Sequence, residues 1–375
     1  MDFSKLNIQT QVVHAGFEPE SDISQPIHLS TTFKRESHEQ VGGYTRSGNP
    51  NRAALEKKLA LLEHGAEAIA FSSGMAAVNA LFETTLTSGT NVIYPDDCYH
   101  GTRSLLKNLL ESKGITSKQV DMTSVDNVAK AIDAKTKLIW IESPSNPQLK
   151  ITDIKSVAAL AKPKNIVVGC DSTFANPLFQ NPLDLGVDVV MHSTTKFLSG
   201  HSDILGGALV VKEQSELLNK IRLHQGIAGA VPSPFDCWLL NRSIATFPLR
   251  VKVQSENAMA LAEYLAAHKK IEKVFYPGLA SHTNHAIAKS QMNGGFGGVL
   301  SVCVKGGQKD ALDLCRKLKL VKHATSLGGV ETLIEHRRSA EGALALSPDN
   351  LLRISTGIEN ILDLTNDFEQ ALYLS

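Results

Sequence analysis

The sequence predicts an α/β protein with a large domain built on a mostly parallel sheet and a smaller C-terminal α+β domain. Its 375 residues exceed what one hydrophobic core comfortably supports, so two domains are expected. Short apolar runs alternate with helical patterns in the first part of the chain, which is typical of a parallel sheet. From about Pro232, long helical patterns take over, with a further strand at 298–304. We therefore predict an N-terminal arm over 1–45, a large domain over 46–235 and a C-terminal domain over 236–375.

The composition is that of an ordinary globular protein, with 42% hydrophobic and 20% charged residues. Lysine plus arginine (38) equals aspartate plus glutamate (38), so the charge balance gives no reason to expect nucleic acid or a membrane surface as a partner. The first residues lack a basic segment followed by an apolar one, and no run approaches the roughly 20 apolar residues of a membrane span. These features predict a cytoplasmic protein.

The cysteines and histidines do not form a disulfide or metal pattern. The five cysteines are widely scattered without a C-x-x-C pair, which favours free thiols in a reducing compartment. His282 and His285 lie close together in a polar turn, but no carboxylate or cysteine beside them completes a ligand set. We expect no metal site.

The first 40 residues show no clear periodicity and predict an extended arm that packs on a neighbour rather than forming a core of its own. The arm leads into a loop rich in glycine, asparagine and proline, which holds Tyr44 and Arg46. On this segment alone, a solvated turn is as good an interpretation as a binding loop. Asn51 is placed to cap the helix that follows.

The next signal is a strand, a turn and a helix. Residues 67–71 form the predicted strand, the turn contains Ser73 and Gly74, and Met75 opens the helix. Ser72 or Ser73 can cap this helix. Its free backbone N–H groups and positive dipole end would then point at the turn, which suits a phosphate. Many such turns bind nothing, so this signal is weak by itself.

Later strands of the same domain also end in polar side chains. The strands predicted at 91–94, 137–141 and 166–169 are followed by Tyr99, Asn146 and Asp171, respectively. In an open α/β sheet the ligand crevice lies outside the carboxyl ends of the strands, so these side chains could converge. Tyr99 could stack on a planar ring or be an ordinary half-buried tyrosine. Asp171 could face a pyridinium nitrogen and keep it protonated, or cap a turn.

Lys196 lies in a polar loop, residues 192–201, between apolar runs at 187–191 and 205–211 that suit buried strands. An amine held between buried strands is partly desolvated, which lowers its pKa and makes it a nucleophile for a carbonyl. Neighbouring hydroxyls and backbone N–H groups could hold a phosphate. A lysine that condenses with an aldehyde beside a phosphate cradle suggests pyridoxal phosphate as the cofactor. The alternative is an exposed loop lysine, which is the common case.

In the C-terminal domain, Arg353 lies in a half-apolar strand predicted at 351–355. An arginine in such a strand needs an anionic partner. That partner could be a structural carboxylate or the carboxylate of a substrate, and the residues alone favour neither.

Six short motifs resemble, in order, those of the Cys/Met-metabolism family of pyridoxal-phosphate enzymes. They lie at 44–46, 72–75, 142–147, 171–173, 193–196 and 326–329. The family includes cystathionine γ-lyase, cystathionine γ-synthase, cystathionine β-lyase and methionine γ-lyase, and the likeness covers nearly the whole chain. It implies an aspartate aminotransferase-like fold with pyridoxal 5'-phosphate bound in the large domain.

The resemblance also implies roles for individual residues. Lys196 would carry the cofactor, Asp171 would pair with its ring nitrogen, and Tyr99 would stack on the ring and act as a catalytic acid or base. The positions that match the phosphate site are Ser73, Gly74, Met75, Ser193 and Thr195. Those that match the surroundings of the substrate's α-carboxylate are Asn146, Ser326 and Arg353. The loop with Tyr44 and Arg46 would reach the phosphate of a neighbouring subunit, which implies a catalytic dimer, usually within a homotetramer.

The implied reaction is transsulfuration, by γ-elimination to 2-oxobutyrate and ammonia or by γ-replacement with a thiol. The amine of Lys196 would take the α-proton. β-Elimination of cystathionine and γ-elimination of methionine are alternatives of the same class. A non-catalytic relative and a cofactor-free Schiff-base aldolase belong to other classes. The intact Lys196, Asp171 and Tyr99 argue against the first, and the phosphate cradle argues against the second.

Two departures from the family's pattern leave the substrate open. Thr325 stands where several cystathionine-handling members have a glutamate, and residues 335–339 read Glu-His-Arg-Arg-Ser where many members have His-Pro-Ala. These positions are expected on the distal side of the substrate pocket. We hypothesise that Arg337 or Arg338 binds a distal carboxylate, as in cystathionine or succinylhomoserine. A two-arginine surface patch is the alternative.

Overall fold

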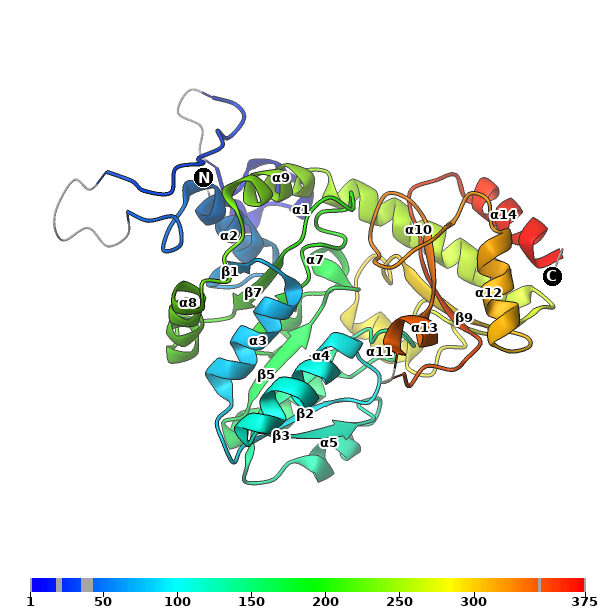
Figure 1. Cartoon of the computed structure of the whole chain (residues 1–375), viewed down its shortest axis with the longest axis horizontal. Helices are drawn as coiled ribbons and strands as arrows, with labels where there is room; N and C mark the ends of the chain where they lie inside the picture. The colour runs from blue at the N-terminus through cyan, green and yellow to red at the C-terminus, as the bar shows by residue number, and fades with distance from the viewer. Residues whose placement is uncertain (1, 18–21, 35–42, 343–344, 374–375) are drawn as a thin grey trace.

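The computed structural model describes residues 2–17, 22–34, 43–342 and 345–373. A large domain and a smaller C-terminal domain lie side by side, and the long helix α10 (Phe247–Ala267) runs from the first along the second (Figure 1). Among the described residues, none of the helices combines the length and apolar character needed to cross a membrane. The predicted fold class is confirmed by the two sheets described next. The points at which the domains divide along the chain stay a prediction.

The large sheet has the strand order β1-β7-β6-β5-β4-β2-β3. Its strands are β1 (Glu67–Phe71), β2 (Asn91–Pro95), β3 (Thr116–Val120), β4 (Thr136–Glu142), β5 (Val167–Asp171), β6 (Val189–His192) and β7 (Gly207–Val211). Strands β2 to β6 are parallel, whereas β7 runs antiparallel to both of its neighbours, β1 and β6. The carboxyl ends of the parallel strands therefore meet at one edge of the sheet.

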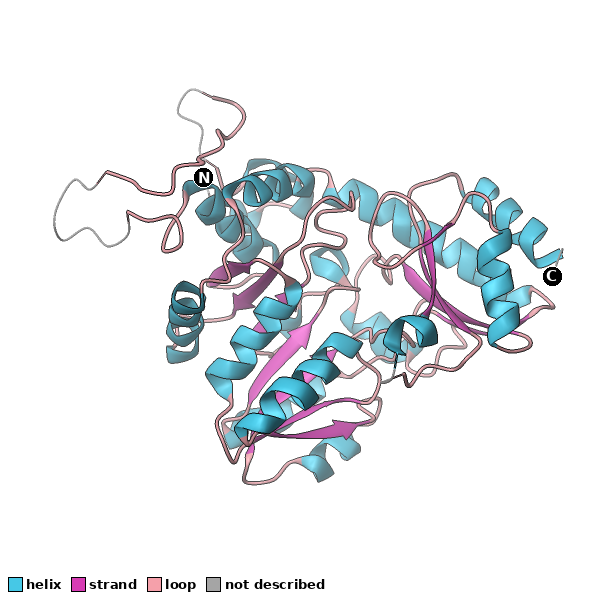
Figure 2. Cartoon of the chain, in the orientation of Figure 1, coloured by secondary structure: helices cyan, strands magenta, loops and turns pink. Residues whose placement is uncertain are grey.

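Helices cover both faces of this sheet, which explains why its strands read as continuous apolar runs (Figure 2). Helices α3, α4 and α8 pack on the face that includes Trp140, and α2, α6 and α9 pack on the face that includes Ile139 and Ile141. The helices of this domain are α2 (Pro50–Leu62), α3 (Gly74–Thr85), α4 (His100–Leu105), α5 (Val125–Ala131), α6 (Ile154–Ala161), α7 (Asn176–Phe179), α8 (Glu216–Ala228) and α9 (Pro234–Ile244).

The C-terminal domain holds a sheet of order β10-β11-β12-β9-β8, antiparallel except between β10 and β11. Its elements are β8 (Ile271–Phe275), α11 (His285–Gln291), β9 (Val299–Val304), α12 (Gln308–Lys317), β10 (Lys322–His323), β11 (Leu333–His336), α13 (Arg337–Glu341), β12 (Leu351–Ser355) and α14 (Ile361–Tyr373). Because side chains alternate along β12, Leu352 and Ile354 pack against the helices, while Arg353 lies on the other face. That face meets the large domain, where Oγ of Ser301 donates to the backbone oxygen of Pro147 at 2.7 Å.

The predicted strands lie within two residues of the observed ones, and β1 and β12 have the predicted bounds. Strands β3, β8, β10 and β11 have no counterpart among them. In β3, four of the five residues are polar and the surface is largely exposed, so it carries no apolar strand pattern. It joins the sheet through its backbone bonds to β2 rather than through an apolar pattern of its own.

Two expectations for the N-terminal part need correction: the arm is not extended throughout, and Asn51 is not the cap of α2. The arm contains a helix, α1 (Ile8–His14), which packs on the large domain: Nζ of Lys58 donates to the backbone oxygen of Val12 at 2.8 Å. The cap of α2 is Asn49, whose side chain accepts the backbone N–H of Asn51 at 2.9 Å. Proline at the first helical position sets this start, so Asn51 lies inside the helix and is buried.

Candidate active site

A cavity of about 440 Å³ lies at the carboxyl ends of the parallel strands, where the C-terminal sheet meets the large domain. All predicted site residues line this cavity except Tyr44 and Arg46. The strand ends therefore converge as the sequence predicts, while the roles of the individual residues stay predictions.

Lys196 projects into this cavity from the loop after β6. Its Nζ donates to Oγ of Ser326, from the C-terminal domain, at 3.0 Å. Burial, and then the nearby guanidinium of Arg353, lowers the pKa of Lys196 to about 8. More of this amine is neutral at physiological pH than of an exposed lysine, which suits a nucleophile for a carbonyl. The alternative of an exposed loop lysine is wrong.

The N-terminus of α3 forms an anion cradle in the same wall. Oγ of Ser73 accepts the backbone N–H of Ala76 at 3.1 Å and caps the helix, while other N–H groups of the first turn have no helical partner. A Cβ at position 74 would lie 3.1 Å from Oγ of Ser193, so glycine allows the loop to approach closely. With Met75, these groups border the cavity and could hold a phosphate.

The loop that leads to Lys196 adds hydroxyl groups to this cradle. The backbone N–H of Ser193 donates to Oγ1 of Thr173 at 2.9 Å, and Oγ1 of Thr195 accepts the N–H of Gly206 at 2.9 Å. Both side chains line the cavity. The Thr173 side chain thus holds the backbone of Ser193, and the backbone of Gly206 holds the hydroxyl of Thr195.

Asp171 ends β5 at the floor of the cavity. Its Oδ1 accepts the backbone N–H of Thr173 at 2.9 Å, which is the bond of a turn residue. Burial raises the pKa of Asp171, although this hydrogen bond opposes the shift. A buried carboxylate needs a positive partner to stay ionised, and a protonated ring nitrogen would supply one.

Glu142, the last residue of β4, also belongs to the site, although its motif at 142–147 predicts a role only for Asn146. Its carboxylate accepts the backbone N–H of Tyr99 at 2.9 Å and that of Asn146 at 2.8 Å. Burial, and then the adjacent Asp171, raises the pKa of Glu142 well above its ordinary value. One carboxylate thus fixes two segments of the site. A charged residue at the end of a buried strand is the sequence signal that points to it.

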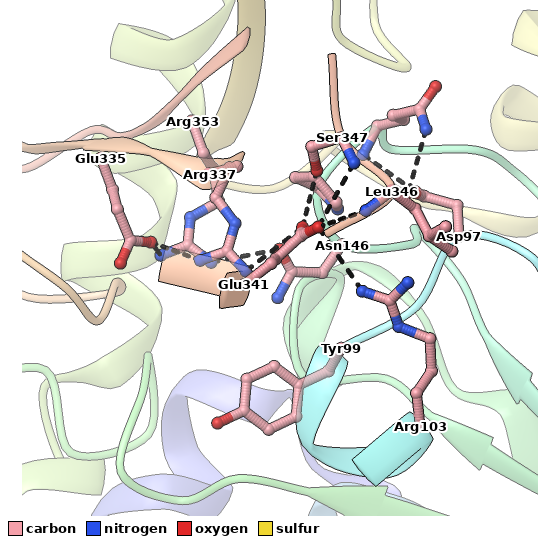
Figure 3. A network of polar contacts seen from close by, with 12 residues as sticks. Asp97, Tyr99, Arg103, Asn146, Glu335, Arg337, Glu341, Leu346, Ser347 and Arg353 are labelled. Atoms are coloured by element: carbon pink, nitrogen blue, oxygen red, sulfur yellow. Dashed lines mark hydrogen bonds and ion pairs between the residues drawn. The ribbon is translucent and has the colours of Figure 1, made fainter. Parts of the chain in front are cut away.

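Tyr99 stands just before α4 and is 37% exposed, with its ring at the cavity. Its ring centroid lies 4.6 Å from that of His100, with the two planes tilted by 57°. A partly open aromatic face of this kind could stack on a planar cofactor ring. Figure 3 shows Tyr99 facing the arginines of the C-terminal domain.

Arg353 joins the two domains from β12. Its Nη1 donates to Oδ1 of Asn146 at 3.1 Å, and its Nη2 donates to the backbone oxygen of Ser326 at 3.0 Å and to Oε2 of Glu335 at 2.6 Å. Burial lowers its pKa to about 10, so the guanidinium stays charged at neutral pH. A structural carboxylate therefore accompanies Arg353, and the guanidinium still lines the cavity, where a substrate carboxylate could reach it.

The structure separates the two neighbouring arginines. Arg337 is 2% exposed and lines the cavity, whereas Nη1 of Arg338 donates to the backbone oxygen of Ser347 at 3.1 Å, away from the cavity. The alternative of a two-arginine surface patch is wrong for Arg337.

Tyr44 and Arg46 lie in an exposed loop outside the cavity. The Cζ of Arg46 lies 5.5 Å from the centroid of the Tyr44 ring, and the backbone oxygens of Thr45 and Arg46 accept hydrogen bonds from Arg52. Within one chain these two side chains do not reach the candidate site.

Comparisons with known proteins identify the family. Its model, described as Cys/Met metabolism PLP-dependent enzyme, matches residues 9–373. The chain belongs to this family. The cystathionine γ-synthase of Mycobacterium tuberculosis (strain ATCC 25618 / H37Rv) is 46% identical over 97% of this chain and 96% of that protein. The cystathionine β-lyase of Coxiella burnetii is 42% identical over 98% of both. The crystal structure of metB from Corynebacterium glutamicum matches with a TM-score of 0.96 and 41% identity over 100% of both chains.

Membership in the Cys/Met-metabolism family confirms the resemblance and the cofactor predicted from the sequence motifs. This protein is a pyridoxal-phosphate-dependent enzyme of transsulfuration. The cavity fits that cofactor, because it offers a lysine of lowered pKa, an anion cradle and a buried carboxylate for the ring nitrogen. No cluster of three or more His, Cys, Asp or Glu residues suited to a metal ion occurs in the part of the chain that the structure describes.

Proposed function

We propose that this enzyme replaces the γ-substituent of an acylated homoserine with the sulfur of cysteine and so forms cystathionine. The observation that carries the proposal is the position of Lys196, whose Nζ lies 3.0 Å from Ser326 in a cavity bounded by the α3 anion cradle and Arg353. The cystathionine γ-synthase at 46% identity supports γ-replacement. γ-Elimination of cystathionine is the second candidate, because it begins with the same loss of the α-proton and departure of the γ-substituent.

The residues of the chain suit these steps. Pyridoxal phosphate, when bound, supplies the electron sink that makes the α-proton acidic. Arg353 and Asn146 would hold the α-carboxylate of the substrate, which fixes the Cα–H bond in orientation. The amine of Lys196, which is neutral above pH about 8, would accept the α-proton. Tyr99 would act as an acid or base, and Glu142 holds its backbone N–H in place.

Product analysis tests this proposal. With O-succinyl-L-homoserine and L-cysteine, we expect cystathionine and succinate, and with L-cystathionine alone we expect only slow release of 2-oxobutyrate, cysteine and ammonia. Both activities should be absent from the Lys196→Ala variant. Fast release of 2-oxobutyrate from cystathionine, without synthesis, would favour the γ-lyase. Pyruvate and homocysteine would show β-elimination and overturn the proposal.

We propose further that the active site is shared between two subunits, within a homotetramer in the cytoplasm. The exposed position of Tyr44 and Arg46 supports sharing, because the family's phosphate-binding positions that they match lie outside this chain's own cavity. Nearby apolar side chains of the arm support an interface, since Ile27 and Leu29 are 38% and 70% exposed. The free, buried cysteines support a reducing compartment.

Complementation between two defective variants tests the shared site. The Tyr44→Ala/Arg46→Ala variant keeps Lys196. The Lys196→Ala variant keeps the loop with Tyr44 and Arg46. After random re-association of an equal mixture, about half of the dimers contain one subunit of each variant. One of the two sites in such a dimer has both Lys196 and an intact loop, so about a quarter of all sites are native. Measured activity should rise to about that fraction of the native value, above the sum of the two separate variants. No gain on mixing would contradict sharing.

A further inference from the structure

Arg337 is a charged side chain of the cavity wall that the steps above do not use. It is the first residue of α13, directly after β11, and it is 2% exposed. Figure 3 shows it between Glu335 and Glu341, on the side of the site that faces Tyr99. A buried charge of this kind costs desolvation energy that ion pairs alone often fail to offset.

Arg337 uses few of its hydrogen-bond donors within the protein. Its Nη1 donates to Oε2 of Glu335, and its Nη2 lies 3.7 Å from Oε1 of Glu341, too far for a hydrogen bond. In the described residues, neither Nε nor Nη2 has a hydrogen-bond partner. Buried polar groups are nearly always paired, so unpaired donors in a cavity wall indicate a ligand or water that completes them. The Nε and Nη2 edge is suited to a carboxylate, which it binds through two parallel bonds.

His100 is a second unpaired group in the same wall. It opens α4, and its Nδ1 is buried without a hydrogen-bond partner in the described ranges. His100 and Arg337 both line the cavity, and burial, followed by the charge of Arg337, lowers the pKa of His100. A neutral imidazole still donates one N–H, so His100 can assist an anion at this position.

The carboxylates around Arg337 leave the cluster positive. Oε2 of Glu335 is shared by Arg337 and Arg353, so one oxygen serves two guanidinium groups. Glu341 lies 3.5 Å from Nη2 of Arg103 as well as 3.7 Å from Arg337. Three guanidinium groups against two carboxylates attract a negatively charged substrate.

We infer that Arg337, with His100 beside it, forms a subsite for a carboxylate at the far end of the substrate, beyond the γ-carbon. Arg353 holds the α-carboxylate, and Oε2 of Glu335 bridges the guanidinium groups of Arg337 and Arg353. A turn of the Arg337 guanidinium toward the cavity presents its unpaired edge to the ligand. The inference rests on the proposed γ-replacement and narrows its substrate class to homoserine esters that carry a second carboxylate.

The neighbouring Arg338 provides a matched control. It has the same side chain one position along α13, but it bonds the backbone oxygen of Ser347 and does not line the cavity. Removing its charge leaves the subsite intact, so any effect specific to position 337 is not an effect of net charge.

The test compares kcat/KM for O-succinyl-L-homoserine and O-acetyl-L-homoserine, with cysteine at a fixed concentration. These two esters undergo the same replacement and differ in the distal carboxylate. The native enzyme should prefer the succinyl ester. Arg337→Met should lower the succinyl-to-acetyl ratio at least about tenfold, mainly by raising KM for the succinyl ester. Arg338→Met should keep the ratio within about twofold of native.

The outcomes separate this inference from the function on which it rests. An equal loss with both esters in Arg337→Met would mean that Arg337 only stabilises the fold, and a native enzyme without preference would overturn the subsite as well. If Arg337→Met does not fold, Arg337→Lys replaces it, because lysine keeps the charge and loses the two-bond geometry. The ratio should then fall by a smaller factor, and an unchanged ratio would refute the subsite. Turnover of neither ester would refute both the proposed function and this inference.

Discussion

Replacing Lys196 with alanine should lower kcat at least about 10⁴-fold and remove the visible absorption band of the lysine–cofactor linkage. No other lysine in the described part of the chain lines the cavity, so no second amine can take its place. The pKa of about 8 means that the protein disfavours the charged ammonium at this position. The substitution should therefore leave folding stability unchanged or higher, which thermal unfolding can measure. Steady-state kinetics and an absorption spectrum give the other two results.

The control for this prediction is Lys212→Ala. Lys212 is exposed directly after β7, a strand of the same sheet, and it lies outside the cavity. Its removal should change neither the absorption band nor kcat. A visible band that survives in Lys196→Ala would show that another lysine carries the cofactor, and the assignment of the site would then be wrong.

The large-domain half of the site could be predicted because its chemistry lies at strand ends. Ser73, Tyr99, Asn146, Asp171 and Lys196 each follow an apolar run, and a parallel sheet brings the carboxyl ends of its strands to one edge. Local sequence patterns were therefore sufficient to group residues that lie more than one hundred positions apart. The motifs of the family added the phosphate and substrate positions.

The half of the site that the C-terminal domain supplies could not be predicted in the same way. Arg353 bonds Asn146 across 207 positions of the chain, and this pairing depends on how two sheets pack, for which no short pattern exists. The two arginines after β11 show the same difficulty. Adjacent residues on a helix point about 100° apart, so the direction of each depends on where α13 begins. That start is set by the end of β11, and only the structure distinguishes the inward Arg337 from Arg338.

Glu142 shows a further kind of residue that sequence reasoning overlooks. Its carboxylate accepts the backbone N–H groups of Tyr99 and Asn146. Residues of this kind act through the geometry of others, so their function depends on contacts between backbone segments rather than on a motif. The positions of Tyr99 and Asn146 in the site depend on this carboxylate, because it holds their backbone N–H groups.

Asp171→Asn should lower kcat about 10²- to 10³-fold while KM stays within a few fold of native. Asparagine keeps the shape of the side chain, and its oxygen can still accept the N–H of Thr173, which lies 2.9 Å from Oδ1 of Asp171 in the native protein. The turn should therefore be preserved. The substitution removes only the negative charge that would keep a ring nitrogen protonated. A nearby charge shifts a pKa by about 1–3 units, and each unit corresponds to about a factor of ten in the population of the reactive protonated form. Saturation kinetics, with the bound cofactor measured by absorption, test this expectation.

Asp188→Asn is the matched control, because the same substitution at the opposite edge of the sheet removes a charge without touching the cavity. Oδ2 of Asp188 accepts the backbone N–H of Val168 at 2.8 Å, which resembles the bond between Asp171 and Thr173. We expect kcat to be unchanged there. If Asp171→Asn instead binds the cofactor and keeps its kcat, the carboxylate does not support the ring nitrogen. Asp171 would then act only as a turn residue. The bond to the N–H of Thr173 is the interaction that an aspartate and an asparagine at position 171 can both make.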